Sequence, residues 1–491
     1  MDVQATTAPP LATEADTIAV GLFEDRDEFS PEVAELVSAG EARRELGKLA
    51  VLHAPERRLI LVGLGQSERF GAEQARVAAA AAHGRAQELS SATLCWEVPR
   101  PRPGDRMVTG PDRTVTGLVE GTLLHAYRFE RYRSEAGERR VERLLLSAAE
   151  DVEAEARRAA IVAGAQNRAR DLGNLPPNDL PPSALAEYAQ ELADGQPAVR
   201  ALVLDGEEIQ GMGMGAFSAV AQGSAQDARL IRLDYEPDTP VSPRLGFVGK
   251  AVTFDAGGLA LKPRQGLEEM KFDMCGGAAV IEAVAALAEL EVPARVTAVV
   301  GATENLPGGR AMKAGDIVRA LDGTTIEINN PDAEGRLVLA DCLTYARQEG
   351  CQRLIDLATL TGGVVTALGS VYAGLMTNNG TWGAIVRECG DHAGDRLWPL
   401  PLDEQYAEMI EGRYAQLTNL AERREAQPIT AAELLHHFAG DVQWAHIDIA
   451  GTAWDVPRPY YVGKGATGFG VRLLVELART LTAGPHCVRG E

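Results

Sequence analysis

The chain alternates between short apolar runs, which are typical of buried strands, and longer segments with the apolar spacing of helices. In the first part, Ile18–Phe23 and Leu59–Gly63 have the strand pattern, whereas Pro31–Val37 and Ala72–Leu89 have the helical pattern. This alternation predicts a small α/β domain over residues 16–150. Residues 1–15 are polar and contain two prolines, and we expect a disordered tail there.

One long helix is predicted to follow this domain. Residues 149–170 are rich in Ala, Glu and Arg and contain no glycine or proline before Gly164. Their alternating charges are typical of a solvated helix face. The proline-rich segment Asn174–Pro182 ends any helix. We therefore assign residues 151–172 to a linker helix and residues 173–491 to a second, larger domain.

The second domain repeats the alternation. Its candidate strands are Leu245–Phe254, Val296–Ala302, Thr325–Asn329, Arg353–Leu360 and Trp444–Ala450, and its helical patterns are Gly276–Leu290, Glu334–Arg347 and Ala431–Phe438. The order predicts a two-domain α/β protein in which the larger domain has a central, largely parallel mixed sheet covered by helices. In such sheets ligands bind outside the carboxyl ends of the strands.

The charge balance excludes several classes of partner. The 491 residues include 48 Lys and Arg against 70 Asp and Glu, a formal net charge of −22. Nucleic-acid binding and docking to anionic membranes depend on basic residues, so we expect neither. The excess is uneven, because residues 1–170 carry −4 and residues 171–491 carry −18.

The lack of a targeting signal and the pattern of cysteines predict a cytoplasmic protein. No apolar run approaches the roughly 18 residues of a membrane span, and the N-terminus has no apolar core of a secretory signal. The six cysteines form no Cys-x-x-Cys pair. We read them as reduced thiols of a cytosolic protein.

Three segments place charged residues where a predicted strand or loop meets glycines or a helix start. They are Gly249–Gly258 with Lys250 and Asp255, Leu261–Met274 with Lys262 and Asp273, and Asn329–Leu337 with Asp332, Glu334 and Arg336. Four carboxylates packed together would raise one another's pKa values unless cations lay between them. Oxygen ligands without thiolate or imidazole suit Mg²⁺, Mn²⁺ or Zn²⁺ in a two-metal site.

Each of these residues also has a plainer interpretation. Charges at strand ends are usually solvated, and a lysine such as Lys250 commonly forms a salt bridge to nearby carboxylates. An arginine such as Arg336 usually pairs with a surface carboxylate. The combination of the three segments is what favours a metal site.

The same segments resemble the leucyl aminopeptidase (cytosol aminopeptidase) family. The family hallmark is Asn-Thr-Asp-Ala-Glu-Gly-Arg-Leu, and Asn330–Leu337 matches it except at Pro331. The Lys-x₄-Asp-x-Gly-Gly pattern of Lys250–Gly258 matches as well. Further matching stretches are Arg170–Asn178, Asp356–Gly362 and His446–Ala453, so the resemblance extends from about residue 168 to residue 474.

The resemblance implies a metal-dependent exopeptidase with two divalent ions per subunit, Zn²⁺ or Mn²⁺, with Mg²⁺ and Co²⁺ as further candidates. One ion would be held by Lys250, Asp255, Asp273 and Glu334, and the other by Asp255, Asp332 and Glu334. Lys250 would bind as a neutral amine, because two nearby dications lower its pKa. A metal-bridging hydroxide would release N-terminal residues from peptides with a free amino terminus.

Further roles follow from the same resemblance. Lys262 would bind the developing oxyanion, and Arg336 would hold a bicarbonate that acts as general base. Met270, Thr359, Leu360 and Gly362 would line the pocket for the first side chain, with leucine-type preference, although ordinary core packing explains them nearly as well. The family forms hexamers, so we expect a homo-hexamer.

Two alternatives and two departures complete the prediction. An inactive relative should lose ligands, yet all seven polar site residues are present, and a DNA-binding role is disfavoured by the net charge. Pro331 replaces a threonine beside Asp332, removing a hydroxyl and a backbone N–H. Glu422–Pro428 replaces a segment that usually contains glycine.

Overall fold

A computed structural model of the chain describes residues 1–27, 29–53, 57–100, 111–134, 137, 141–241, 243–457 and 461–483. The end of the predicted second domain, residues 484–491, lies outside these ranges. The chain forms two compact units, one of residues 1–167 and 457–463 and the other of residues 168–456 and 464–491. The boundary falls inside the helix α4 (Glu153–Asn174), where the sequence predicts the linker.

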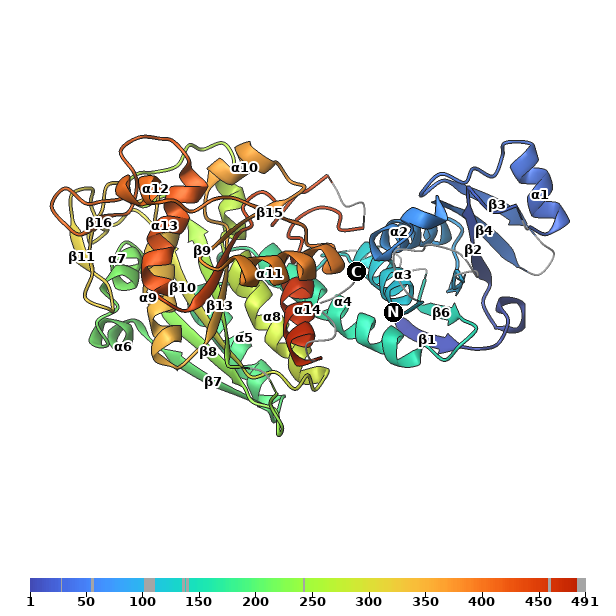
Figure 1. Cartoon of the computed structure of the whole chain (residues 1–491), viewed down its shortest axis with the longest axis horizontal. Helices are drawn as coiled ribbons and strands as arrows, with labels where there is room; N and C mark the ends of the chain where they lie inside the picture. The colour runs from blue at the N-terminus through green and yellow to red at the C-terminus, as the bar shows by residue number, and fades with distance from the viewer. Residues whose placement is uncertain are drawn as a thin grey trace. The chain divides into compact units, whose positions relative to one another are not determined.

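The first unit is built on a six-stranded sheet. Its order is β1 (Asp2–Thr6), β6 (Arg143–Ser147), β5 (Thr93–Glu97), β2 (Thr17–Phe23), β4 (Arg58–Gly65) and β3 (Leu49–His53). The helices α2 (Ala72–Glu88) and α3 (Pro111–Ala126) pack on one face, and α1 (Pro31–Ser38) packs against Leu22 and Leu61 on the other (Figure 1).

The disordered tail predicted for residues 1–15 is wrong. Residues Asp2–Thr6 form β1, which pairs in parallel with β6, and Pro10–Ala12 form a short 3₁₀ turn, η1. Val3 and Ala5 pack against the core, so two small apolar side chains and the backbone ladder order this segment.

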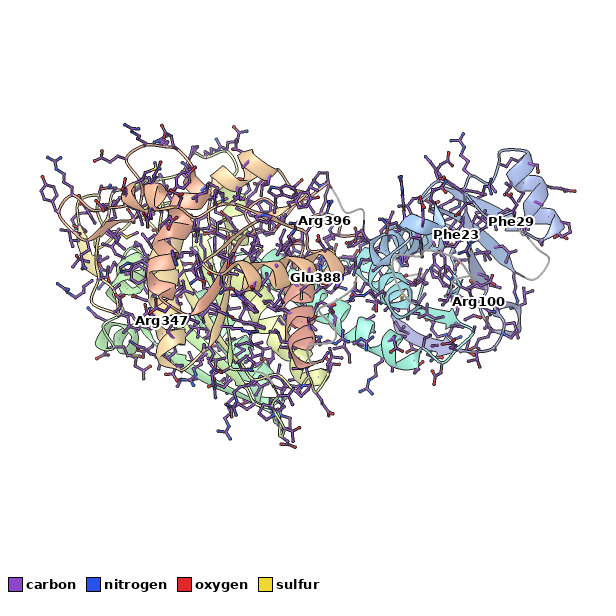
Figure 2. The ribbon with its side chains drawn as sticks, in the orientation of Figure 1. Phe23, Phe29, Arg100, Arg347, Glu388 and Arg396 are labelled. Carbon is purple, nitrogen blue, oxygen red and sulfur yellow. The ribbon has the colours of Figure 1, made fainter. Side chains whose placement is uncertain are left out.

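A cavity of about 700 Å³ lies in the first unit, with largely apolar walls that include Phe23, Phe29 and Val98. Figure 2 labels Phe23 and Phe29 together with Arg100, which also lines it. None of the predicted site residues belongs to this unit.

The second unit contains an eight-stranded mixed sheet. Its order is β15 (Leu397–Pro399), β14 (Ala373–Thr377), β17 (Gln443–Asp448), β13 (Arg353–Ala358), β9 (Leu245–Asp255), β10 (Val296–Asn305), β8 (Arg229–Tyr235) and β7 (Val199–Leu204). The four central strands β17, β13, β9 and β10 are parallel, whereas β14, β8 and β7 add antiparallel pairs. The predicted fold class, a mixed sheet covered by helices, is confirmed.

Helices cover both faces of this sheet (Figure 1). One group, α7 (Gly215–Ala221), α9 (Gly335–Gln348) and α13 (Gln427–Ala439), buries the face that carries Val248 and Val299. On the other face, α8 (Cys275–Glu289) packs on β9. The helix α14 (Val471–Thr482) packs against both α8 and α11 (Gly380–Ala393). The remaining helices of this unit are α5 (Pro182–Asp194), α6 (Gly206–Gly211), η3 (Leu267–Phe272), α10 (Gly362–Leu368) and α12 (Glu404–Glu408), and the first unit also contains η2 (Ser67–Arg69).

One predicted strand lies outside the main sheet. Thr325–Glu327 forms β12, which pairs with β11 (Ile317–Arg319) and β16 (Leu417–Thr418) in a separate three-stranded sheet. The strand β13 also ends at Ala358, two residues before its predicted end. The segment that follows it is therefore a loop, which becomes important at the site.

A buried histidine gives the first unit a predicted response to acid. The Nδ1 atom of His83 on α2 lies 2.8 Å from Nδ1 of His125 on α3, and burial lowers the pKa of His83 from 6.5 to about 3. Between these pH values the unfolded chain binds a proton that the folded chain refuses. The stability that neutral His83 contributes is thus complete above pH 6.5 and is lost as the pH falls toward 3.

We expect this loss to reach a few kcal/mol, on the order of 1.4 kcal/mol per pKa unit. Thermal unfolding followed between about pH 7 and about pH 4 measures it. His83→Gln, which cannot take up a proton, should show a shallower fall of the melting temperature than the unsubstituted protein. Equal slopes for the two proteins would contradict the assignment.

Candidate functional site

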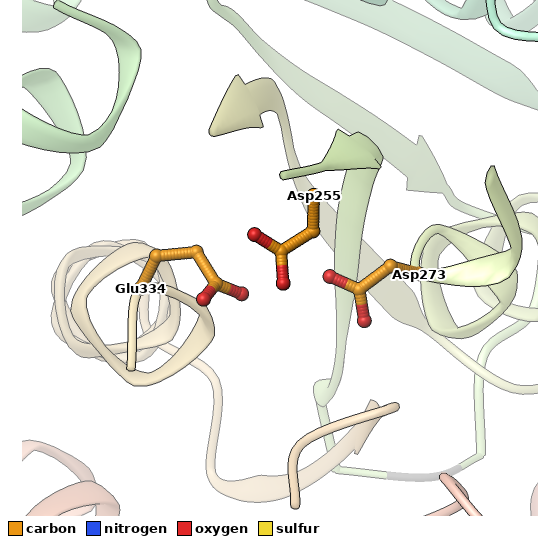
Figure 3. A group of neighbouring side chains, drawn as sticks. All are labelled: Asp255, Asp273 and Glu334. Atoms are coloured by element: carbon orange, nitrogen blue, oxygen red, sulfur yellow. The ribbon is translucent and has the colours of Figure 1, made fainter. Parts of the chain in front are cut away.

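Three buried carboxylates meet at the carboxyl end of the large sheet. Asp255 is the last residue of β9, Asp273 follows η3, and Glu334 immediately precedes α9. Each offers a carboxylate oxygen, and these oxygens lie within 4.8 Å of one another (Figure 3). The side chains converge from a strand, a loop and a helix start, as the predicted positions at element ends imply.

Two lysines enter this cluster from different sides. Lys250 Nζ lies 2.8 Å from Asp273 Oδ2 and 2.8 Å from Glu334 Oε1. Lys262 Nζ lies 2.8 Å from Asp255 Oδ2 and also contacts Asp332 Oδ1. The lysines differ in exposure, since the side chain of Lys250 is 3% exposed and that of Lys262 is 21% exposed. The structure therefore joins Asp332 to the three buried carboxylates through Lys262.

Two glycines make room for these side chains. A Cβ atom at Gly335 would lie 2.7 Å from Cε of Lys250, so the lysine can pass over the start of α9 only because this residue has no side chain. At Gly257, which has φ +86°, a Cβ atom would lie 2.7 Å from Oδ1 of Asp332. Both glycines belong to the matched sequence patterns.

The electrostatics of the cluster are unbalanced. Burial raises the pKa of Asp255 to about 6 and that of Asp273 well above its usual value. Glu334 is the exception, because Lys250 and Lys262 outweigh its burial and lower its pKa. With both lysines protonated and all four carboxylates ionised, two negative charges would remain uncompensated. This donor set, rich in oxygen and short of positive charge, fits divalent cations.

Asn305 is a site residue that sequence reasoning missed. It ends β10 and lies opposite Asp255 in the register of the two parallel strands. Its Nδ2 donates to Asp255 Oδ1 at 2.8 Å and to the carbonyl of Pro331 at 3.1 Å. The N–H of Gly257 also donates to Oδ1 at 2.9 Å. Oδ1 is thereby committed to these two hydrogen bonds, whereas Oδ2 faces Lys262. The sequence signal that could have identified Asn305 is a polar residue at the end of a strand that neighbours β9 in the parallel sheet.

Asn419 is a second missed residue. Its side chain accepts a hydrogen bond from the N–H of Asn329 at 2.7 Å and donates to the carbonyl of Asn330 at 2.7 Å. Asp332 N–H donates to Asn330 Oδ1 at 2.9 Å. The loop that carries Pro331 and Asp332 is thus held by side-chain amides. None of these hydrogen bonds uses the backbone N–H that proline lacks.

Arg336 is a buried cation without a carboxylate partner within the described ranges. It is the second residue of α9 and is 3% exposed. Its Nη1 donates to the carbonyl of Asn419 at 2.9 Å, while its buried Nε has no hydrogen-bond partner in the described part of the chain. Burial lowers its pKa to about 10. A guanidinium at a helix N-terminus with an unused donor suits a small oxyanion.

The residues predicted for a side-chain pocket lie around the same cluster. Thr359, in the loop after β13, donates from Oγ1 to Asp273 Oδ1 at 2.6 Å and accepts from Lys250 Nζ on its carbonyl at 2.9 Å. Leu360 and Gly362 follow in the same loop, and Gly362 begins α10. Met270 lies in η3, whose last turn leads into Asp273. Their role in substrate binding stays a prediction.

The segment Glu422–Pro428, which differs from the family pattern, contains a strained residue. Ala426 has φ 45° and ψ 39° at the start of α13. This left-handed conformation is natural for glycine and costs an alanine about 1 kcal/mol. The alanine therefore occupies a conformation in which a glycine-containing segment would be unstrained.

Comparisons with known proteins agree with this geometry. The family model described as the cytosol aminopeptidase family, catalytic domain, matches residues 167–475, and the model of its N-terminal domain matches residues 18–136. A probable cytosol aminopeptidase of Roseiflexus castenholzii is 41% identical over 98% of this chain and 100% of the relative. One of Azotobacter vinelandii is 42% identical, covering 89% of this chain and 88% of the relative.

Solved structures agree as well. The bottromycin maturation enzyme BotP in complex with Mn is 33% identical with a TM-score of 0.86, covering 95% of this chain and 100% of that chain. A point mutant of tomato leucine aminopeptidase is 30% identical with a TM-score of 0.87, covering 98% of this chain and 96% of that chain.

The role of Asn305 can be tested by substitution. Asn305→Ala removes both Nδ2 hydrogen bonds and frees Asp255 to rotate. We expect the affinity of the metal-free protein for Mn²⁺ to fall by about 10- to 100-fold, as is usual when a residue that orients a ligand is lost. Isothermal titration calorimetry measures this affinity.

Asn378→Ala is the matched control. Asn378 Nδ2 donates to the carbonyls of Gly440 and Val442, next to the start of β17 rather than at the carboxyl end of the sheet. The control should lose some stability and bind Mn²⁺ as the unsubstituted protein does. Unchanged Mn²⁺ binding by Asn305→Ala would contradict the assigned role.

Proposed function

The chain belongs to the cytosol aminopeptidase family, and from this premise we propose that it releases N-terminal amino acids from peptides in a metal-dependent reaction. That it is a peptidase, and hence a hydrolase, follows from the family. The observation that supports metal dependence is the buried cluster of Asp255, Asp273 and Glu334, whose charge two lysines only partly neutralise.

The four carboxylates would hold two divalent cations, with Asp255 and Glu334 shared between them and Lys250 as a further ligand of one. Zn²⁺ or Mn²⁺ are our first candidates, and Mg²⁺ and Co²⁺ are alternatives. When bound, such cations lower the pKa of water and polarise a carbonyl. They would also offset the carboxylates that now raise the pKa of Lys250 against its burial, which allows the amine to bind in its neutral form.

The two lysines are proposed to differ in role because they differ in exposure. The side chain of Lys250 is nearly inaccessible to solvent, so it can act only inside the cluster, as the proposed ligand of one cation and as a contact of Asp273 and Glu334. Lys262 is partly exposed between Asp255 and Asp332, where its ammonium group can donate a hydrogen bond to the oxygen of a peptide carbonyl as negative charge develops.

Arg336 is proposed to hold bicarbonate. The guanidinium offers planar donors that match a planar oxyanion, and its buried Nε has no hydrogen-bond partner in the described residues. Bound there, bicarbonate would supply a base beside the carboxylate cluster. Met270, Thr359, Leu360 and Gly362 would face the first side chain and favour leucine-type residues.

The setting in the cell is also part of the proposal. Within the described ranges no helix has the length and apolar character required to cross a membrane. In the described part of the chain, Cys95, Cys275, Cys342 and Cys351 are buried free thiols, which is typical of a reducing compartment. We propose a cytoplasmic enzyme that acts on peptides as a homo-hexamer.

The function is tested with peptides whose amino terminus is free or blocked. Protein loaded with Mn²⁺ or Zn²⁺ should hydrolyse leucine p-nitroanilide and leucyl dipeptides, and should leave the N-acetylated forms intact. Removal of the metal by a chelator should abolish release of p-nitroaniline, and addition of metal should restore it. Hydrolysis at an undiminished rate without metal would refute metal dependence, and failure on every free-amine substrate would favour an inactive relative.

The ligand assignment is tested with Asp332→Ala. Loss of this carboxylate should lower bound metal from about two ions per chain toward one, and should lower kcat/KM at least about 100-fold. Atomic absorption and steady-state kinetics on one preparation measure both. Asp391→Ala removes an exposed carboxylate of α11 and should change neither quantity. Full activity of Asp332→Ala would exclude Asp332 as a ligand.

A further inference from the structure

The loop after β13 is held by a buried carboxylate that no pattern assigned to the site. Asp448 is the last residue of β17 and lies beside Ala358, the last residue of β13. It is fully buried. From this strand end its side chain reaches the loop Thr359–Thr361, which connects β13 to α10.

The Asp448 carboxylate acts only as a hydrogen-bond acceptor. Oδ1 accepts from the N–H of Leu360 at 3.1 Å and from the N–H of Ala450 at 3.2 Å. Oδ2 accepts from Thr361 Oγ1 at 2.7 Å. Thr361 Oγ1 in turn accepts from the N–H of Val364 and caps α10. An amide at position 448 could accept on only one of its two atoms.

The first residue of the loop that Asp448 holds, Thr359, contacts the cluster of carboxylates and Lys250. The carbonyl of Thr359 accepts from Lys250 Nζ, and Thr359 Oγ1 donates to Asp273. Lys250 and Asp273 are two of the proposed ligands of one cation. A shift of Leu360 or Thr361 must therefore move the residue that fixes both.

Holding a loop with a buried charge costs desolvation free energy. Burial raises the pKa of Asp448 against the opposing charge of His446, whose ring is itself hydrogen-bonded to Asp356 at 2.6 Å. Neutral caps, such as that of Asn379 on α11, hold other turns of this chain. The cost is understandable if the position of this loop matters for more than folding.

We propose that Asp448 is a positioning residue of the active site. It fixes Thr359–Thr361 so that Thr359 holds Lys250 and Asp273 in the arrangement that receives a divalent cation. This inference rests on the proposed metal-dependent function and extends it to a residue on the neighbouring strand.

The test compares Asp448→Asn with Asp341→Asn. Asp341 is also buried and accepts from the N–H groups of Phe217 and Leu321, both at 2.8 Å, but it lies about two turns further along α9 than the cluster. Both variants should melt at a lower temperature. Only Asp448→Asn should weaken Mn²⁺ binding to the metal-free protein by about 10- to 100-fold, change the electron paramagnetic resonance spectrum of bound Mn²⁺, and lower kcat more than it raises KM.

Two outcomes would overturn the proposal. In one, Asp448→Asn binds Mn²⁺ with the affinity of the unsubstituted protein. In the other, Asp341→Asn loses Mn²⁺ affinity to the same extent, which indicates a purely structural effect. If the unsubstituted protein neither binds Mn²⁺ nor cleaves peptides, it is the proposed function that fails instead.

A second pair of variants covers the case in which Asp448→Asn does not fold. Thr361→Val removes the hydroxyl that donates to Asp448 while keeping the shape of the side chain, and Thr361→Ser keeps the hydroxyl. Thr361→Val should weaken Mn²⁺ binding several-fold, and Thr361→Ser should restore it to within about twofold of the unsubstituted protein. Equal Mn²⁺ affinity of the two variants would overturn the proposal.

Discussion

Buried negative charge is the constraint on which the larger unit depends. Asp255, Asp273 and Glu334 lie within 4.8 Å of one another and away from water, where like charges repel strongly. Lys250 and Lys262 supply part of the compensation. When the carboxylates are ionised, divalent cations would supply the rest, and for this reason the arrangement favours a metal site. The cluster thus accounts for four of the acids behind the net charge of −22, and beyond the general effect of net charge on solubility the rest of the −18 in residues 171–491 has no structural explanation.

The backbone near the cluster is arranged to admit long side chains and is then held in place from outside. Gly335 and Gly257 leave space where a Cβ atom would collide with Lys250 and Asp332. Loops opened in this way need other restraints. Amide and carboxylate side chains from neighbouring strands and loops provide them, with Asn305 on Asp255 and Asn419 on the loop before α9. The proposed ligands are consequently held by residues outside the proposed ligand set.

The sequence predicted the parts of the site that are local. Asp255 ends a long apolar run and Glu334 opens a helix, so their positions follow from periodicity alone. Asn305 and Asn419 were missed because their partners lie 50 and 89 residues away, and asparagine is equally common in ordinary turns. The same reason explains the two errors of fold. The strand β1 is ordered by pairing with a distant strand, and the three-residue strand β12 is too short for its own pattern to specify a sheet.

The two lysines show how position decides chemistry when the residue type does not. Both meet two carboxylates, and in both the carboxylates outweigh burial and raise the pKa. One side chain is enclosed by a strand, a helix start and the loop after β13, so no substrate can reach its nitrogen. The other lies at the edge of the cluster, where a carbonyl oxygen can approach it. In the first place the nitrogen can act only within the cluster, as the proposed ligand of one cation, and in the second an ammonium group can stabilise charge that appears during the reaction. The family resemblance already implies different tasks for the two lysines, and their different exposure in the fold is compatible with that proposal.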